Sequence, residues 1–316
     1  MTKQMRAATY SEFGGPEKVS INTVEIPEIG EGEVLVRVRA AGVNPVDYAV
    51  REGYLKENLP TKFPVIPGWD LAGEVVDRGF SARRFDVGDE VYAYARRPVV
   101  QHGTFAEYIV LPESYLALKP KNSSWEEAAG IPLVGLTAYQ SLFDAGHLQE
   151  GQTVLILGAS GGVGSLGIQL AKAKGAKVIG VASEKNHSHM RDLGADHTVD
   201  YKSNHVGEAV QQLVPDGVDL IFDCASGETL QQSLQALKPS GKLVSILNHG
   251  TDLNPDIDFT YVFVEPNSRQ LDHLRELAEA GKLRVPVSRT YTLDETMEAM
   301  KQIQTSHTTG KIVILP

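Results

Sequence analysis

The sequence predicts an α/β protein in which a β-rich first domain is followed by a doubly wound parallel sheet. Three observations predict it. Short alternating strand patterns fill the first third of the chain. From about residue 124, strand patterns alternate with helical ones, which favours right-handed crossovers in a parallel sheet. The tail then changes character again, so we expect it to fold back onto the first domain.

The first domain is predicted to be a barrel or a sandwich. In the segment 33–41, one face of the predicted strand carries Val34, Val36 and Val38, and the other carries Leu35, Arg37 and Arg39, as in a half-buried strand. Further strand patterns cover 68–76, 88–94 and 105–111. Several short strands separated by prolines and glycine turns are typical of such folds.

The second domain is predicted to begin at a capping box, Ser124-Trp125-Glu126-Glu127, which starts a helix. An apolar strand at 154–157 is typical of a parallel sheet covered on both faces. The remaining strand patterns are 177–181, 220–223 and 242–247, and the helical ones are 133–148, 164–174, around Met190, and 228–237.

The tail carries amphipathic helical patterns at 269–280 and 293–303, with a second capping box at Thr292 and Glu295. A terminal strand is predicted at 311–315. The expected domains are therefore 1–123 with 266–316, and an inserted domain at 124–265.

Composition excludes several function classes. The 316 residues carry a formal net charge of -10, which argues against nucleic acid or an anionic membrane as partner. The single cysteine, Cys224, rules out an intrachain disulfide and a cysteine-based structural zinc site. We expect a cytoplasmic protein, since no apolar run is long enough for a signal peptide or a membrane span.

The main functional signal is the run Gly158-Ala159-Ser160-Gly161-Gly162-Val163-Gly164, called the phosphate cradle below. It lies between an apolar strand and a helix, where glycines let a pyrophosphate approach free backbone N–H groups. The residues predicted to bind the cofactor here are Ser160, Gly161, Gly162 and Val163. An ordinary glycine-rich turn is the alternative, which the flanking strand and helix disfavour.

The end of the next strand distinguishes NADPH from NADH. Ser183 and Lys185 could bind a 2′-phosphate through a hydroxyl and a cation, which favours NADPH. Glu184 could instead bind the ribose hydroxyls, which would favour NADH. A solvated surface position is the alternative for Lys185.

Several ordered motifs then match one family. They are Gly42-Val43-Asn44-Pro45-Val46-Asp47, Pro67-Gly68-Trp69-Asp70-Leu71-Ala72-Gly73-Glu74-Val75, Gly88-Asp89-Glu90-Val91-Tyr92, Gly103-Thr104-Phe105-Ala106-Glu107-Tyr108, Gly135-Leu136-Thr137-Ala138 and the cradle. Over nearly its whole length the chain resembles the zinc-independent quinone oxidoreductase branch of the medium-chain dehydrogenase/reductase superfamily.

The resemblance implies a GroES-like barrel for the first domain and an inserted Rossmann domain, with the nicotinamide in the cleft between them. It implies homodimers, sometimes tetramers. It also implies that Thr137 contacts the cofactor and that Ser183, Lys185 and Tyr201 surround the 2′-phosphate. A buried packing tyrosine is the alternative for Tyr201. The family often has an arginine that contacts the cofactor where this chain has Thr309, so the sequence gives less support for phosphate or pyrophosphate binding at that end.

Zinc-dependent relatives have a cysteine near the Val43-Asn44 stretch and a histidine at the position of Trp69. Neither ligand type is present here, so we predict no metal site.

The chemistry expected of the protein is to orient the substrate and stabilise charge, because the hydride belongs to the cofactor. Asn44 could offer an amide N–H to the substrate or ribose, and Asp47 could order a water or a cofactor hydroxyl. Tyr54 and Tyr48 are candidate proton donors, with packing in the cleft as the alternative for each.

The predicted function is an NADPH-dependent reductase of quinones or α,β-unsaturated carbonyl compounds, taking its proton from a tyrosine or water. One alternative is a dinucleotide-binding redox sensor without turnover. A zinc alcohol dehydrogenase is a second alternative, disfavoured by the missing ligands.

Overall fold

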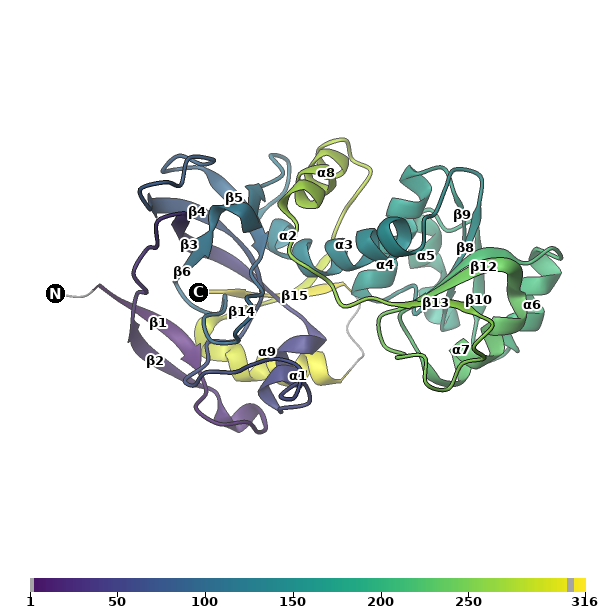
Figure 1. Ribbon diagram of the computed structural model, residues 1–316, viewed down its shortest axis with the longest axis horizontal. Coiled ribbons are helices and arrows are strands. Elements are labelled where there is room, and N and C mark those ends of the chain that lie inside the picture. Colours follow the sequence, from purple (N-terminus) through teal and green to yellow (C-terminus); the bar gives the residue numbers. More distant parts are fainter. Residues whose placement is uncertain (1–2, 306–309) are drawn as a thin grey trace. The chain divides into compact units, whose positions relative to one another are not determined.

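The computed structural model describes residues 3–305 and 310–316, and it divides into two units. Unit 1 comprises the chain up to Leu133 and from Glu265 onward, and unit 2 is Val134–Val264. In Figure 1, unit 1 combines purple and yellow ribbons, whereas unit 2 is a continuous run of teal and green. The first boundary falls at Leu133 rather than 123, because helix α2 (Trp125–Ala129) packs on strands of unit 1.

Unit 1 is built on a seven-stranded sheet of order β14-β15-β3-β4-β5-β7, with β6 also paired to β3. Two further strands, β1 and β2, form a separate antiparallel pair. The bounds are β1 Gln4–Thr9, β2 Ser20–Glu25, β3 Glu33–Val43, β4 Asp70–Arg78, β5 Glu90–Tyr94, β6 Tyr108–Pro112, β7 Leu116–Leu118, β14 Val287–Thr292 and β15 Lys311–Leu315.

The predicted alternation in β3 is confirmed in part, since Arg37 is exposed but Leu35 on the same face is buried. Val34, Val36 and Val38 are all buried, and they join one core with residues of β4, β5 and β15. Branched side chains on one face of a pleated strand pack well against neighbouring strands, which accounts for this face becoming the core.

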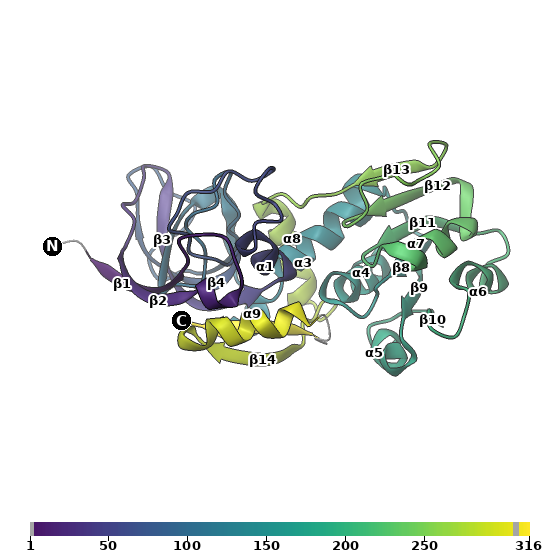
Figure 2. The ribbon, with the colours of Figure 1, turned by 90° about the horizontal axis from the view of Figure 1, so that it is seen from below.

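The tail contributes to unit 1 through helices α8 (Ser268–Glu279) and α9 (Thr296–Gln304) and through β14 and β15. Strand β15 pairs antiparallel with β3, so that Ile312 lies opposite Val43. Helix α9 lies along β14 (Figure 2). The predicted capping box is confirmed, since Thr292 and Glu295 cap the short helix η6 (Leu293–Glu295) before α9.

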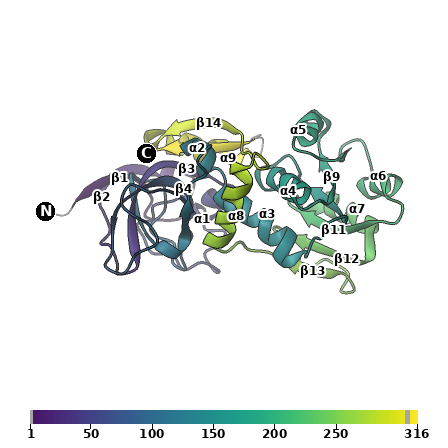
Figure 3. The same ribbon diagram turned by 90° about the horizontal axis from the view of Figure 1, so that it is seen from above.

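Unit 2 is built on a six-stranded sheet of order β10-β9-β8-β11-β12-β13, in which every pair is parallel. Figure 3 shows this unit passing from teal to green without interruption. The predicted doubly wound sheet is therefore confirmed. The strand bounds are β8 Thr153–Leu157, β9 Lys177–Ala182, β10 His197–Asp200, β11 Val218–Asp223, β12 Leu237–Ser245 and β13 Asp258–Tyr261.

Helices cover both faces of this sheet. Leu155, Leu157 and Ile179 point to a core that includes Val206 of α6 and Leu230 of α7. On the other face, Gly167 of α4 approaches Ile156 and Phe222, and Met190 of α5 approaches Gly180. The helices are α4 Gly162–Ala173, α5 His187–Asp192, α6 Val206–Leu213 and α7 Gly227–Ser233.

Two predicted helices differ in detail from those observed. The helix predicted at 133–148 is α3 (Pro132–Tyr139), which continues as a wider π-helical segment, η3 (Gln140–Ala145). The helix predicted at 228–237 ends earlier, because η5 (Leu234–Ala236) tightens the chain and Leu237 already begins β12. In the described part of the chain, no helix is both long and apolar enough to cross a membrane.

Candidate functional site

The phosphate cradle follows the carboxyl end of β8. Gly158 has φ +69°, a conformation that L side chains rarely adopt, and Gly161 caps α4. A Cβ on Gly164 would lie 2.5 Å from the Gly158 carbonyl oxygen, so only glycine lets the helix start this close to the turn. Ser160, Gly162 and Val163 are half-exposed at the start of a twelve-residue helix. This arrangement presents backbone N–H groups and a positive helix end to an anion.

Asn186 ties the cradle to the end of the next strand, a role that sequence reasoning missed. Its Nδ2 donates to Ser160 Oγ at 3.1 Å and to Ser183 Oγ at 3.3 Å. Asn186 lies in the short helix η4 (Glu184–Asn186) directly after β9. The available signal was an amide side chain three residues after Ser183, a spacing at which it can bond back to that hydroxyl.

The predicted 2′-phosphate residues lie at the carboxyl ends of β9 and β10, which are neighbouring parallel strands. Ser183 is half-buried, whereas Glu184 and Lys185 are exposed. Tyr201 is 44% exposed, which excludes the alternative of a buried packing tyrosine. Parallel neighbours end at the same sheet edge, so this edge holds all three predicted residues.

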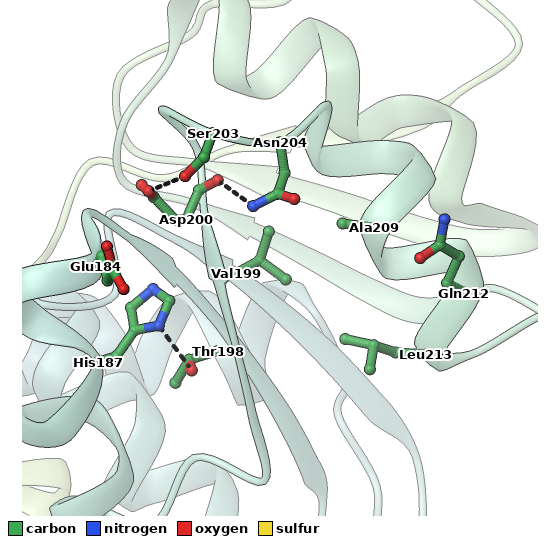
Figure 4. A pocket seen from close by; sticks show the side chains of 10 residues that line it. All are labelled: Glu184, His187, Thr198, Val199, Asp200, Ser203, Asn204, Ala209, Gln212 and Leu213. Atoms are coloured by element: carbon green, nitrogen blue, oxygen red, sulfur yellow. Dashed lines mark hydrogen bonds between the residues drawn. The ribbon is translucent and has the colours of Figure 1, made fainter.

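A hollow of about 370 Å³ opens beside this edge (Figure 4). His187 Nδ1 lies 3.1 Å from Thr198 Oγ1, and its Nε2 is buried without a partner. The Ser203 hydroxyl and the Lys202 N–H bond the Asp200 carboxylate and lower its pKa. The lining residues are Glu184, His187, Thr198, Val199, Asp200, Ser203, Asn204, Ala209, Gln212 and Leu213.

In unit 1, Asn44 and Asp47 form the start of helix α1 (Pro45–Arg51). The Asn44 backbone N–H donates to Asp47 Oδ2 at 2.7 Å, half of a capping box. Asp47 is buried, and its Oδ1 has no hydrogen-bond partner. Burial raises the pKa of Asp47 to about 7, against the opposing effect of the Asn44 N–H.

Asn44, Asp47, Asp70 and Lys311 form one buried polar cluster, of which sequence reasoning missed the last two. Asn44 Nδ2 donates to Asp70 Oδ2 at 2.8 Å, and Lys311 Nζ donates to Asn44 Oδ1 at 2.5 Å. Lys311 Nζ also lies 3.6 Å from Asp70 Oδ2. Burial lowers the pKa of Lys311 and raises that of Asp70 to about 6, while their mutual attraction opposes both shifts.

The sequence contains a signal that could have identified Asp70 and Lys311 as members of this cluster. Asp70 and Lys311 are charged residues at the first positions of β4 and β15, each followed directly by a buried stretch of its strand. A charge in such a strand needs a partner of opposite sign. The pairing itself depends on the register of β15 against β3, which places Lys311 next to Asn44.

The two candidate proton donors differ in environment. Tyr54 is 69% exposed and its hydroxyl bonds the Glu52 carboxylate, which raises the pKa of Tyr54 and lowers that of Glu52. Arg51 and Gln304 donate to the same carboxylate at 2.6 and 2.5 Å. Tyr48 is half-buried on α1. A higher pKa makes Tyr54 a weaker acid.

Of two other predicted features, one can be placed. Thr137 is buried on α3. Thr309 lies outside the described residues.

The resemblance places Trp69 where zinc-dependent relatives have a histidine ligand. Trp69 is buried and packs edge-to-face on Tyr94. Within residues 3–305 and 310–316, no group of three or more His, Cys, Asp or Glu side chains has the arrangement to hold a metal ion.

Comparisons with known proteins cover nearly the whole chain. A model of the alcohol dehydrogenase GroES-like domain matches residues 30–121, and a model of zinc-binding dehydrogenases matches 193–314. The chain is 35% identical to an NADPH-dependent alkenal/one oxidoreductase of Arabidopsis thaliana, covering 99% of this chain and 80% of that protein.

Two further similarities agree with these matches. The chain is 34% identical to a 2-methylene-furan-3-one reductase of Solanum lycopersicum, covering 99% of this chain and 79% of that protein. The solved structure of a quinone oxidoreductase from Coxiella burnetii superimposes with a TM-score of 0.88 at 32% identity, covering 99% of this chain and all of that one.

Proposed function

Because the chain is an oxidoreductase of the medium-chain dehydrogenase/reductase superfamily, we propose that it reduces quinones or α,β-unsaturated carbonyl compounds with NADPH and without zinc. The observation that carries this proposal is the phosphate cradle in a chain similar along its whole length to reductases of these substrates.

The preference for NADPH rests on the edge formed by β9 and β10. Ser183 offers a hydroxyl there and Lys185 an exposed cation, both suited to a 2′-phosphate. Asn186 fixes the Ser183 hydroxyl relative to the cradle. The name of the Arabidopsis relative, an NADPH-dependent enzyme, supports the same choice.

When bound, the nicotinamide supplies the hydride, and negative charge then develops on a substrate oxygen. Asn44 is completely buried in this structure, and its amide donates one of its two N–H groups to Asp70. The proposal assigns the second N–H to the substrate or the ribose once they are bound. Because Glu52 engages the Tyr54 hydroxyl, we favour Tyr48 or water over Tyr54 as the proton source.

Zinc independence is supported by the charge of the cluster as well as by its residue types. The Lys311 ammonium lies against Asn44, and a cation there repels a second cation. Amide and indole groups in place of thiolate and imidazole bind zinc poorly. We expect purified protein to keep its activity in a chelator and to hold no stoichiometric zinc.

Titration with NADPH and NADH, followed by nicotinamide fluorescence, tests the cofactor assignment. We expect tighter binding of NADPH, and a loss of roughly 3- to 10-fold in NADPH affinity on Lys185→Ala with little change for NADH. Lys174→Ala, an exposed lysine at the opposite end of α4, is the matched control and should change neither. Equal or tighter NADH binding would instead make Glu184 the ribose ligand.

Turnover on a panel of quinones and enones tests the reaction itself. NADPH oxidation that depends on the electrophile supports the proposal. Tight NADPH binding with no turnover on any member of the panel would favour a redox sensor instead.

We also propose that the chain forms a homodimer, as the family resemblance implies. The six-stranded sheet ends at β10 and β13, and the described chain pairs neither strand on its outer side. Open strand edges are places where another chain can add.

A further inference from the structure

The Lys311–Asp70 pair lies in the interior of unit 1. Lys311 is 4% exposed and Asp70 is completely buried. Removing two charges from water costs free energy that their attraction often fails to recover, so such a pair is weak evidence for stability. Its contacts with Asn44 suggest a different role.

Chemistry fixes how Asn44 can sit between these two groups. A lysine ammonium only donates hydrogen bonds and a carboxylate only accepts them. The amide oxygen must therefore face Lys311 and the amide nitrogen must face Asp70, as observed at 2.5 and 2.8 Å. The flipped amide would place donor against donor and acceptor against acceptor.

Asp70 makes a second connection through its other oxygen. The Leu133 backbone N–H donates to Asp70 Oδ1 at 2.8 Å. Leu133 lies in the first turn of α3, where N–H groups lack partners within the helix and a carboxylate is favourable. The same helix carries Thr137, the predicted cofactor contact.

We propose that Lys311 and Asp70 are positioning residues for the reduction, which hold the completely buried Asn44 amide in one of its two orientations and so fix the direction in which its second N–H points. Asp70 at the same time anchors the start of α3. This inference rests on the proposed function, in which Asn44 offers that N–H to the substrate or ribose.

A double-mutant cycle tests the inference in the full-length protein with NADPH and an enone that the wild type reduces. Lys311→Met should lower kcat about 10- to 100-fold, because a misplaced orienting group loses this much. In an Asn44→Ala background the same change should have almost no further effect on kcat, since the group that Lys311 orients is gone. A merely structural role would give equal losses in both backgrounds and would overturn the proposal.

The matched control is Lys119→Met. Lys119 is the other buried lysine of unit 1, paired with Glu90 at 3.2 Å and bonded to the Ser123 carbonyl, far in the sequence from Asn44. The Lys119→Met substitution should leave kcat within about twofold of the wild-type value. A loss as large as that of Lys311→Met would overturn the proposal.

If Lys311→Met fails to fold, the neutral pair Asp70→Asn with Lys311→Met replaces it, because removing both charges avoids leaving one unpaired. This variant should fold and still lose kcat about tenfold or more. Wild-type kcat in this folded variant would overturn the proposal. Absence of turnover in the wild type would refute the proposed function instead, so the two failures are distinguishable.

Discussion

At the scale of single residues, Asp47 shows how burial changes what a side chain can do. The sequence places it as a candidate for ordering a water or a cofactor hydroxyl. The structure gives it a capping contact to the Asn44 N–H and leaves its Oδ1 buried without a partner. Asp47 can cap the helix through Oδ2 and still order a water or a cofactor hydroxyl through Oδ1, because a carboxyl group has two oxygens.

Asp47→Asn tests this burial through the pH dependence of stability. The pKa of Asp47 rises from 3.8 to about 7 on folding. The folded protein therefore holds a proton that the unfolded chain releases, and stability falls as pH rises between those values. We expect the free energy of unfolding of Asp47→Asn, measured in urea from pH 5 to 8, to fall less with pH than that of the wild type.

The exposed Asp216→Asn serves as the matched control for this measurement and should keep the wild-type pH dependence. Parallel curves for Asp47→Asn and the wild type would show that Asp47 is ionised throughout this range.

At the scale of elements, the cradle depends on two glycines that act differently. A Cβ on Gly164 would lie 2.5 Å from the Gly158 carbonyl oxygen and 2.6 Å from the Ala159 Cα, which are backbone atoms that cannot turn aside. A Cβ on Gly161 would meet the Gly158 oxygen only at 3.3 Å. Gly164 is thus needed for the close approach of the helix to the turn, whereas Gly161 lies where the predicted pyrophosphate approaches.

Gly164→Ala should lower the free energy of unfolding by about 1–3 kcal/mol and weaken NADPH binding, because the start of α4 must move away from the turn. Gly161→Ala should weaken NADPH binding with a smaller loss of stability. Thermal unfolding and fluorescence titration of the two variants measure these effects. Equal stability of Gly164→Ala and the wild type would contradict the close approach.

Several elements with a strong local pattern were predicted, although the amphipathic helix α6 was missed, and two strands without such a pattern were missed as well. The apolar strand β8 and both capping boxes come directly from neighbouring residues. Strands β13 and β14 have few buried side chains and so lack the expected alternation. Pairing with a neighbouring strand, rather than local preference, makes such segments extended.

At the scale of the whole molecule, the proposed homodimer makes a direct prediction. The chain has a mass of 34.3 kDa, and light scattering after gel filtration should give about twice this value. The mass should be measured at protein concentrations from micromolar upward, because the association of two chains depends on their concentration. A mass of one chain across that range would contradict the proposal.

The sequence by itself determined the fold class, the cradle and the class of cofactor, because strand periodicity, caps and a glycine-rich turn are properties of neighbouring residues. Only the tertiary structure decided how Asn44 is held. Its partners Asp70 and Lys311 are 26 and 267 residues away. They meet because β15 pairs with β3 in one register and because burial leaves each charge no other partner than the groups brought beside it.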